Sequence, residues 1–252
     1  MPVVIKYGGN AMTSEPLRQA VAKDISQLAQ RGFLPVVVHG GGPFIKQALD
    51  EAGLEHSFIR GLRVTTARSL PIVEQSLTIL NKKLSQEITN AIGLSGRDNK
   101  TLVAKKISAE LGYVGTITQV NHSFLRNLLD ISITPVIAPL ASDNHLGILN
   151  VNADEVAGAV AASLGSAVIF LSDVAGVLDD YKNPESLLTE ITEAQIKKRI
   201  ANGKIAGGMI PKVEAALNAL HQGADYVVIA DGREADILNK VLAGKAGTKI
   251  IS

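Results

Sequence analysis

Two segments near the start of the chain, VVIKYGG (residues 3–9) and LPVVVHGGGP (residues 34–43), decide the fold. Each is a short run rich in β-branched residues that ends in a cluster of glycines, so each predicts a buried strand followed by a tight turn. A strand, a helix and a second strand in this order are typical of a parallel sheet covered by helices. The intervening helix, predicted over Glu15–Arg31, has apolar residues at helical spacing: Leu17, Val21, Ile25 and Leu28.

The rest of the chain continues the same alternation. Further strands are predicted over residues 134–138, 167–171, 226–229 and 248–251. Further helices are predicted over residues 44–52, 66–92 (one or two helices), 123–130, 152–164, 210–222 and 234–243. Thr101–Val120, rich in Val, Ile, Thr and Gly, predicts a small antiparallel excursion. Because no repeat or linker interrupts the pattern, we expect an α/β fold of two lobes that share one mostly parallel sheet.

Composition excludes several classes of protein. The 252 residues include 25 basic and 24 acidic side chains, a formal net charge of +1, whereas proteins that bind nucleic acid are usually far more basic. Cysteine is absent, which excludes disulfides and thiolate metal sites, and the five histidines lack metal-ligand spacing, so we interpret them as structural or surface residues. The sequence has neither a signal peptide nor an apolar run of membrane length. We therefore expect a cytoplasmic protein with no protein-bound metal, no nucleic acid partner and no membrane contact.

Both glycine clusters, Gly8-Gly9 and Gly40–Gly42, stand between a predicted strand and a helix. Backbone N–H groups at such a junction can approach an anion without interference from Cβ atoms, although glycines that merely form tight turns are the alternative. The sequence lacks GxxxxGK[ST], and Ile45 stands where a Rossmann fingerprint requires its third glycine. An esterase that uses HGGG as its oxyanion hole requires a GxSxG turn, and the nearest candidate, residues 93–97, ends in arginine.

Five charged residues stand at positions suited to binding or catalysis. Lys6 interrupts an apolar strand just before a glycine cluster, and Lys212 lies just inside a predicted helix, where a cation opposes the helix dipole unless an anion is near. Asp173 ends a predicted core strand, the end at which open α/β sheets bind ligands. Asp154 also has a structural role available in the first turn of its helix. Arg63 either binds a carboxylate through two hydrogen bonds or pairs on the surface.

Motifs spread over nearly the whole chain resemble those of the N-acetylglutamate kinase family, within the amino-acid kinase superfamily. They are KYGGNAM (6–12), VVVHGGGPFI (36–45), GLRVT (61–65), GLSGRD (93–98), LNVNADEVAGAVA (149–161), LSDVAGVL (171–178), GGMIPKVEAAL (207–217) and GTKII (247–251). The resemblance implies a three-layer αβα sandwich, a single amino-acid kinase domain over residues 1–252. A lobe of about residues 1–150 would bind the amino-acid substrate, and a lobe of about residues 151–252 would bind ATP. Asn99-Lys100 and Phe44 depart from the residues usual in the family.

The resemblance also implies an activity, the ATP-dependent phosphorylation of the side-chain carboxylate of N-acetyl-L-glutamate in arginine biosynthesis. Lys6 and Lys212 would neutralise the transferring phosphoryl group, and Asp154 would orient both ammonium groups. The amino-acid substrate would be bound by Gly41, Gly42, Arg63 and Asn150. ATP and its phosphates would be bound by Gly8, Gly9, Asp173, Val174, Gly176, Val177, Leu178, Lys204, Ile205 and Ala206. Mg²⁺ would be held mainly by the ATP phosphates, and the carboxylate nucleophile needs no general base because it is already ionised.

The residues also permit two other functions. The first is that of a related kinase, which phosphorylates α-aminoadipate or glutamate attached to a small acidic carrier protein. A basic segment on the substrate side would suit such a carrier, although Val64-Thr65 does not fit that branch. The segment contains His56, Arg60, Arg63 and Arg68. The second is a non-catalytic sensor of amino acid or nucleotide, which would not need Lys6, Asp154 and Lys212 together.

The resemblance raises an expectation about assembly as well. Family members that arginine inhibits usually carry an extra helix before the first strand, and here only Met1 and Pro2 precede Val3. We therefore expect a homodimer that is insensitive to arginine and whose other partners are small-molecule substrates. The helix predicted within residues 66–80 could form the interface or face the protomer's own core, because it carries an apolar stripe. The stripe consists of Leu70, Val73, Leu77 and Leu80.

Overall fold

The computed structural model describes residues 1–9, 12–180 and 182–252, so Asn10 and Ala11 of the first motif lie outside the described residues. An eight-stranded sheet crosses the molecule in the order β12-β14-β13-β11-β1-β2-β8-β5. Every neighbouring pair is parallel except β13 and β14. The strands are β1 (Pro2–Tyr7), β2 (Leu34–His39), β5 (Ala91–Ser95), β8 (Thr134–Ala138), β11 (Ala167–Ser172), β12 (Glu190–Thr192), β13 (Val227–Asp231) and β14 (Thr248–Ile251).

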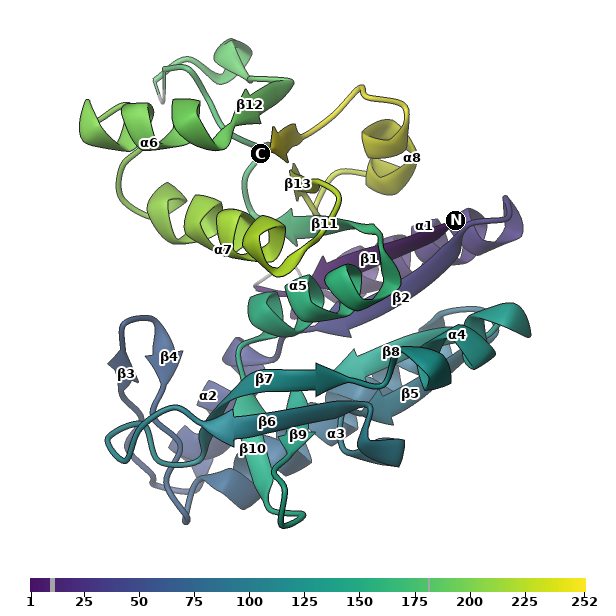
Figure 1. The fold of residues 1–252 in the computed structure, drawn as a ribbon, viewed down its shortest axis with the longest axis vertical. Helices are drawn as coiled ribbons and strands as arrows, with labels where there is room; N and C mark the ends of the chain where they lie inside the picture. Colours follow the sequence, from purple (N-terminus) through teal and green to yellow (C-terminus); the bar gives the residue numbers. More distant parts are fainter. Residues whose placement is uncertain (10–11, 181) are drawn as a thin grey trace.

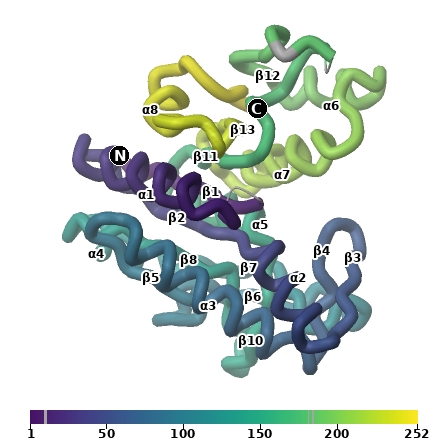
Figure 2. Tube along the Cα trace, turned by 180° about the vertical axis from the view of Figure 1, so that it is seen from behind, coloured from purple at the N-terminus to yellow at the C-terminus, as the bar shows by residue number. Residues whose placement is uncertain are grey.

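Helices cover both faces of this sheet (Figures 1 and 2), which confirms the predicted three-layer αβα sandwich. One face carries α4 (His122–Asp130), α5 (Ala153–Leu164) and α7 (Met209–Gln222), with α6 (Glu193–Ala201) beside α7. The other face carries α1 (Glu15–Gln30), α3 (Leu70–Glu87) and α8 (Ile237–Leu242), and α2 (Gly42–Glu51) packs against α3. In the described part of the chain, no helix is long and apolar enough to cross a membrane.

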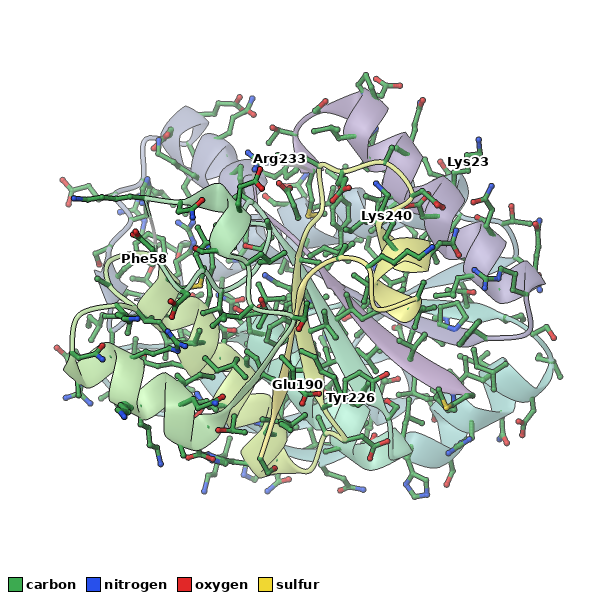
Figure 3. The ribbon with its side chains drawn as sticks, turned by 90° about the horizontal axis from the view of Figure 1, so that it is seen from above. Lys23, Phe58, Glu190, Tyr226, Arg233 and Lys240 are labelled. Atoms are coloured by element: carbon green, nitrogen blue, oxygen red, sulfur yellow. The ribbon has the colours of Figure 1, made fainter. Side chains whose placement is uncertain are left out.

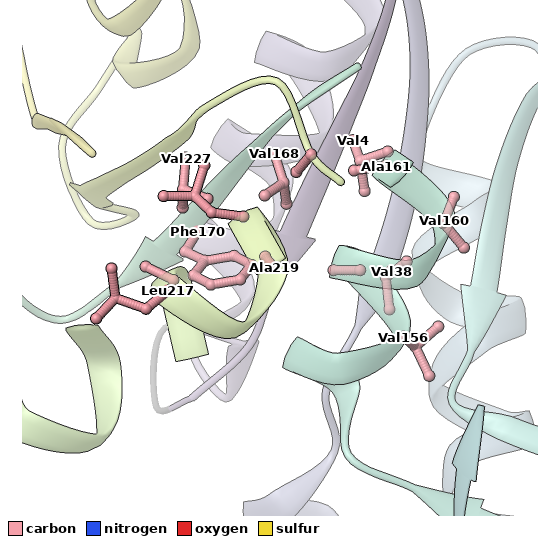
Figure 4. Close-up of a cluster of buried hydrophobic side chains, with 14 of the residues drawn as sticks. Val4, Val38, Val156, Val160, Ala161, Val168, Phe170, Leu217, Ala219 and Val227 are labelled. Atoms are coloured by element: carbon pink, nitrogen blue, oxygen red, sulfur yellow. The ribbon is translucent and has the colours of Figure 1, made fainter. Parts of the chain in front are cut away.

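Alternation along β1 assigns each of its side chains to one face of the sheet. Val4 packs in the core beneath α5 and α7, whereas Val3, Ile5 and Tyr7 pack in the core beneath α1 and α3. Lys6, two residues after Val4, therefore points to the α5 face. Figure 4 shows part of the core on that face, where side chains of α5 and α7 meet those of β1, β2, β11 and β13.

The same alternation governs β2. Val36 and Val38 pack on the α5 face and Val37 packs on the opposite face. His39, the last residue of the strand, follows Val37 at a spacing of two and therefore points toward α3, where it is completely buried.

Two further β structures lie outside the eight-stranded sheet. The predicted antiparallel excursion over Thr101–Val120 is present, as β6 pairs antiparallel with β7. These strands join two short strands in a small closed barrel, and a separate hairpin, β3–β4, projects beside it (Figure 1). The bounds are β3 (Phe58–Ile59), β4 (Leu62–Arg63), β6 (Leu102–Lys106), β7 (Val114–Val120), β9 (Leu140–Ser142) and β10 (Ile148–Val151). The hairpin turn uses Arg60 and Gly61, whose φ angles are 48° and 79°.

Two predicted helices differ from those observed. The helical range 66–92 holds one helix, α3, which ends at Glu87; Ile88 is extended and Asn90, with φ of 52°, turns the chain into β5. The helix predicted from residue 234 begins only at Ile237, because Asp236 has φ of 58°, outside the right-handed helical region. The extended Ile88 ends α3 and the left-handed Asp236 delays the start of α8, and apolar periodicity carries no information about either residue.

The apolar stripe on α3 does not form an interface with another protomer. Val73, Leu77 and Leu80 are each at most 2% exposed and pack within the protomer's own core. Asn99 and Lys100, the departures from family pattern, both have φ of 49°, the conformation that glycine adopts without strain.

Candidate active site

The site lies where the carboxyl ends of β1, β2 and β11 meet. Tyr7 is in register with both His39 and Leu171, so the segments that follow these strands leave the sheet side by side. The two glycine clusters contact each other there, because a Cβ on Gly40 would lie 3.5 Å from the Gly8 Cα. The Gly40 amide donates to the carbonyl of Tyr7 at 2.8 Å.

Lys6 reaches from β1 to the first turn of α5, where its Nζ lies 2.9 Å from Asp154 Oδ1. On its way the Lys6 side chain crosses Gly8, on which a Cβ would lie only 3.1 Å from Nζ. Glycine at position 8 therefore leaves room for the lysine as well as for an approaching anion.

Asp154 is held in place by its neighbours on α5. Asn152 caps the helix, and its Oδ1 accepts from the amides of Asp154 and Glu155 at 2.8 and 3.3 Å. The Glu155 carboxylate accepts from the Thr116 hydroxyl and the Ile117 amide of β7, both at 2.7 Å. Asn152 is thus the N-cap of α5, whereas the anchoring role of Glu155, which depends on a distant strand, has no signal in the local sequence.

Lys212 pairs differently from the expectation that Asp154 would orient both ammonium groups. Its Nζ lies 3.1 Å from Asp173 Oδ1, and this pair lowers the pKa of the Asp173 carboxyl below its usual range. Lys6 and Lys212 nevertheless line one cavity of about 190 Å³, together with Gly8, Gly9 and Asp173. The structure therefore brings the two predicted lysines together, each with its own carboxylate.

The residues predicted to bind the amino-acid substrate line a second cavity, of about 260 Å³, which shares Lys6 and Gly9 with the first. Gly41, Gly42, Arg63 and Asn150 all contribute to its wall. Asn150 donates to the Thr65 hydroxyl at 3.1 Å, and Pro139 and Val151 add apolar surface.

Arg63 is the most informative residue in this second cavity. Its Nη2 donates to the Gly42 carbonyl at 3.3 Å, and its guanidinium lies 4.7 Å from the ring centre of Phe58, labelled in Figure 3. Its Nη1 is buried and has no hydrogen-bond partner. Among the described residues no carboxylate pairs with Arg63, and burial lowers its pKa. A buried, unpaired guanidinium nitrogen is costly unless an anion binds to it.

A third cavity, of about 700 Å³, opens beyond Asp173 in the other lobe. It is lined by all the residues predicted to bind ATP except Gly8 and Gly9: Asp173, Val174, Gly176, Val177, Leu178, Lys204, Ile205 and Ala206. Met209, Asp231 and Arg233, which also line it, were not predicted from the sequence. Asp231 ends β13 just as Asp173 follows β11, so the same strand-end rule could have found it. Arg233 (Figure 3) donates to Asp231 and, at 2.8 Å, to the Asp173 carbonyl.

The three cavities adjoin one another, because Lys6 and Gly9 line both the second and the first and Asp173 lines both the first and the third. Taken in this order, they present a guanidinium with one unpaired nitrogen, then two ammonium groups and a pair of glycines, and then a large and mainly apolar cavity. Such an arrangement fits an anionic substrate, a phosphate chain and a nucleotide placed end to end.

Comparison with known proteins decides the family. Residues 1–231 match the model of the amino acid kinase family. An acetylglutamate kinase from Deinococcus radiodurans is 49% identical over 99% of this chain and 100% of its own. The chain belongs to the acetylglutamate kinase branch of the amino acid kinase family.

Other members show how far the likeness to the amino acid kinase family extends. The chloroplastic acetylglutamate kinase of Arabidopsis thaliana is 43% identical over 98% of this chain and 74% of its own. An N-acetylglutamate synthase from Neisseria gonorrhoeae, solved with coenzyme A and N-acetyl-glutamate, has a TM-score of 0.86 over 100% of this chain and 59% of its own. At 23% identity that likeness shows the amino acid kinase fold alone.

The buried His39, which directly precedes the glycine cluster Gly40–Gly42, should make the stability of the protein depend on pH. Burial lowers the pKa of the His39 imidazole to about 4, from an unfolded value near 6.5. The unfolded state therefore binds more protons between these values, so stability is full above pH 6.5 and is lost as pH falls toward 4. The unfolding free energy should drop by about 1 kcal/mol between pH 7.5 and 5.5.

Denaturant unfolding at the two pH values measures this change. A His39→Asn variant is the matched control, since it should lose the pH-dependent part of the difference. An equal drop in both proteins would assign the effect to other groups.

Proposed function

We propose that the chain catalyses the ATP-dependent phosphorylation of the side-chain carboxylate of N-acetyl-L-glutamate, which yields N-acetyl-L-glutamyl 5-phosphate for arginine biosynthesis. The observation that carries this proposal is the buried, unpaired Nη1 of Arg63 in a cavity that also contains Lys6. A dicarboxylate substrate supplies one carboxylate to each of these cations. The names of the relatives, acetylglutamate kinase, support the same substrate.

In the proposed complex, Arg63 binds the α-carboxylate and Asn150 binds the acetamido group. The amides of Gly41 and Gly42 lie at the start of α2, a helix of ten residues whose N-terminus favours an anion. They donate to the reacting carboxylate and to the phosphoryl group. The cavity of about 260 Å³ is large enough for an acylated amino acid.

Transfer then needs position and charge more than covalent assistance. One oxygen of the side-chain carboxylate forms a bond to the γ-phosphorus, and the bond from that phosphorus to the oxygen bridging the β- and γ-phosphates breaks. ADP leaves with the electron pair, and no proton moves because the carboxylate is ionised before reaction. Lys6 and Lys212 neutralise the equatorial phosphoryl oxygens, and Asp154 holds Lys6 in place.

ATP occupies the cavity of about 700 Å³, with its phosphates extending over Gly8 and Gly9 toward the lysines. Mg²⁺ accompanies ATP and offsets the charge of its phosphates. Among the described residues, no group of three side chains could hold a metal, and Asp173 is the carboxylate in the phosphate cavity. This donor set fits a Mg²⁺ ion that the nucleotide phosphates hold, since Mg²⁺ usually keeps several waters and takes only one or two protein carboxylates.

A hydroxamate assay with acetylglutamate, glutamate and aspartate as acceptors tests the proposal. Hydroxylamine traps the acyl phosphate, so a product from acetylglutamate alone supports the assignment. A product only from carrier-bound glutamate or α-aminoadipate would favour the related carrier-dependent kinase, and no ATP consumption would favour a sensor. We place the enzyme in the cytoplasm, where ATP is available for the reaction.

We expect Lys6→Ala and Lys212→Ala to lower kcat by about 10²–10³-fold each, because each removes one preorganised charge from the transition state. Steady-state kinetics with both substrates saturating measures the effect. Lys83→Ala, which removes an exposed lysine on α3, is the control and should leave kcat unchanged. Near-normal turnover in either lysine variant would remove that residue from the catalytic centre.

Arg63→Ala should raise the KM for acetylglutamate far more than the KM for ATP. A hydrogen bond to a charged group is worth about 1.5–3 kcal/mol, or roughly 10- to 150-fold in KM. Arg68→Ala, which removes an exposed arginine five residues further along the chain, provides the comparison. Equal increases for the two substrates would place Arg63 outside the amino-acid pocket.

We also propose that the enzyme is a homodimer joined through β5 and α3. Within the described residues β5 pairs only with β8, and beside this free edge Ile92 is 38% and Ile79 is 62% exposed. Light scattering should give the mass of two chains, and Ile79→Glu should give that of one. Ile131→Glu, at an equally exposed isoleucine on the α4 side, should remain a dimer. A wild-type monomer would end this proposal.

A further inference from the structure

His39 links the glycine cluster Gly40–Gly42 to the core on the α3 face of the sheet. Its ring is completely buried, and its Nδ1 lies 2.7 Å from the carbonyl oxygen of Gly40. Its Nε2 lies 3.1 Å from Nδ2 of Asn81, on α3. The same Asn81 nitrogen donates to the Val136 carbonyl of β8 at 2.8 Å.

These contacts fix one tautomer of the ring. A carbonyl oxygen only accepts, so the Nδ1 facing Gly40 must carry the proton. The Asn81 nitrogen that faces the Val136 carbonyl must be the NH₂ end of the amide, which assigns the orientation of this amide from its network. Its second hydrogen then points to Nε2 of His39, which must accept. The imidazole is therefore neutral, with Nδ1 protonated.

The sheet leaves room for Asn81 at Gly93 of β5. A Cβ at position 93 would lie 2.4 Å from Asn81 Oδ1 and 2.8 Å from Ser85 Oγ. The pair thus depends on four elements, since β2 supplies the histidine, α3 the asparagine, β8 a carbonyl and β5 the space. Two hydrogen bonds and full burial hold the ring in one orientation, and a third hydrogen bond, to Val136, holds Asn81.

The consequence for the glycine cluster follows from peptide geometry. In a trans peptide, the C=O of one residue and the N–H of the next point in opposite directions. The His39 ring holds the Gly40 carbonyl toward the core, so the Gly41 N–H points away from the core, toward the substrate cavity that Gly41 lines. Within the described part of the chain no acceptor engages this N–H, whereas the Gly40 N–H is taken by Tyr7.

We infer that the His39–Asn81 pair positions the main chain of Gly40–Gly42, so that the Gly41 amide is held ready to donate to the reacting carboxylate or phosphoryl oxygen. His39 is in this sense a positioning residue for phosphoryl transfer and touches no substrate. The inference rests on the proposed function for the identity of the substrate, and on the hydrogen bonds alone for the orientation of the loop.

Two substitutions separate this role from a merely structural one. In His39→Asn the short amide can still donate to the Gly40 carbonyl from the place of Nδ1, whereas His39→Leu fills similar space without a donor. Both variants leave Asn81 without its acceptor, so both should lose stability. We expect His39→Leu to lose about 10–100-fold in kcat and to raise the KM for acetylglutamate, because misplaced catalytic groups typically cost such factors. His39→Asn should stay within about threefold of wild type in kcat, a loss well below that of misplacement.

Leu84→Ala is the matched control for lost stability, since Leu84 is fully buried on the same helix as Asn81. It should lower the melting temperature and leave kcat unchanged at temperatures where the protein is folded. The inference is overturned if His39→Leu keeps near-normal kcat, or if His39→Asn and His39→Leu lose activity equally.

Ring ¹⁵N NMR of the unliganded protein tests the geometry without any substrate. The signals absent from His39→Asn identify His39, and we expect a neutral ring protonated on Nδ1. A ring protonated on Nε2 overturns the inference whatever the enzyme phosphorylates. Failure of the wild-type protein to form a hydroxamate from acetylglutamate, with the Nδ1–H tautomer present, would instead overturn only the proposed substrate.

Discussion

The two-residue alternation of side chains along β1 and β2 is the constraint on which the active site depends. It sends Lys6 to the α5 face, where Asp154 meets it, and His39 to the α3 face, where Asn81 meets it. A slip of one residue in either strand would move that strand's side chains to the opposite faces and separate the pair to which it contributes. The hydrophobic residues between them, packed into separate cores on the two faces, hold the register that this requires.

Lys6 and Lys212, whose ammonium groups line the cavity of about 190 Å³, differ in how rigidly the protein holds them. Lys6 is 19% exposed, crosses Gly8 and pairs with a carboxylate fixed by a capped helix. Lys212 pairs with Asp173, whose side chain is 58% exposed, and an ion pair so open to water contributes little. Lys6 is thus a fixed charge, whereas Lys212 can exchange its carboxylate for a phosphate oxygen at small cost.

Much of this organisation could be predicted from the sequence, and the exceptions share a cause. The long strands and the lysines were found because β-branched runs and charges within them are local signals. The strands β3, β4, β9, β10 and β12 were missed, since they have two to four residues and are defined by distant pairing. The strand β5 was missed because it directly follows α3 and overlaps the range predicted as helical. The pairing of Lys212 with Asp173 likewise depends on how α7 lies against β11. His39 was interpreted only as a structural or surface residue, because its partner, Asn81, lies 42 residues away.

Recognition through main-chain atoms bears on how this site could resist an inhibitor. Every amino acid except proline carries a backbone N–H, so among point mutations in residues 40–42 only a change to proline can delete a donor that an inhibitor would use, and it would remove the same donor from the substrate. Adding a side chain at Gly41 would bring a Cβ to 2.6 Å from Leu77 Cδ2, so that either the Leu77 side chain or the loop would have to shift. A mutation in residues 40–42 that weakens an inhibitor would therefore also lower the enzyme's activity. This makes the backbone amides of the loop favourable contacts for an inhibitor that mimics the substrate.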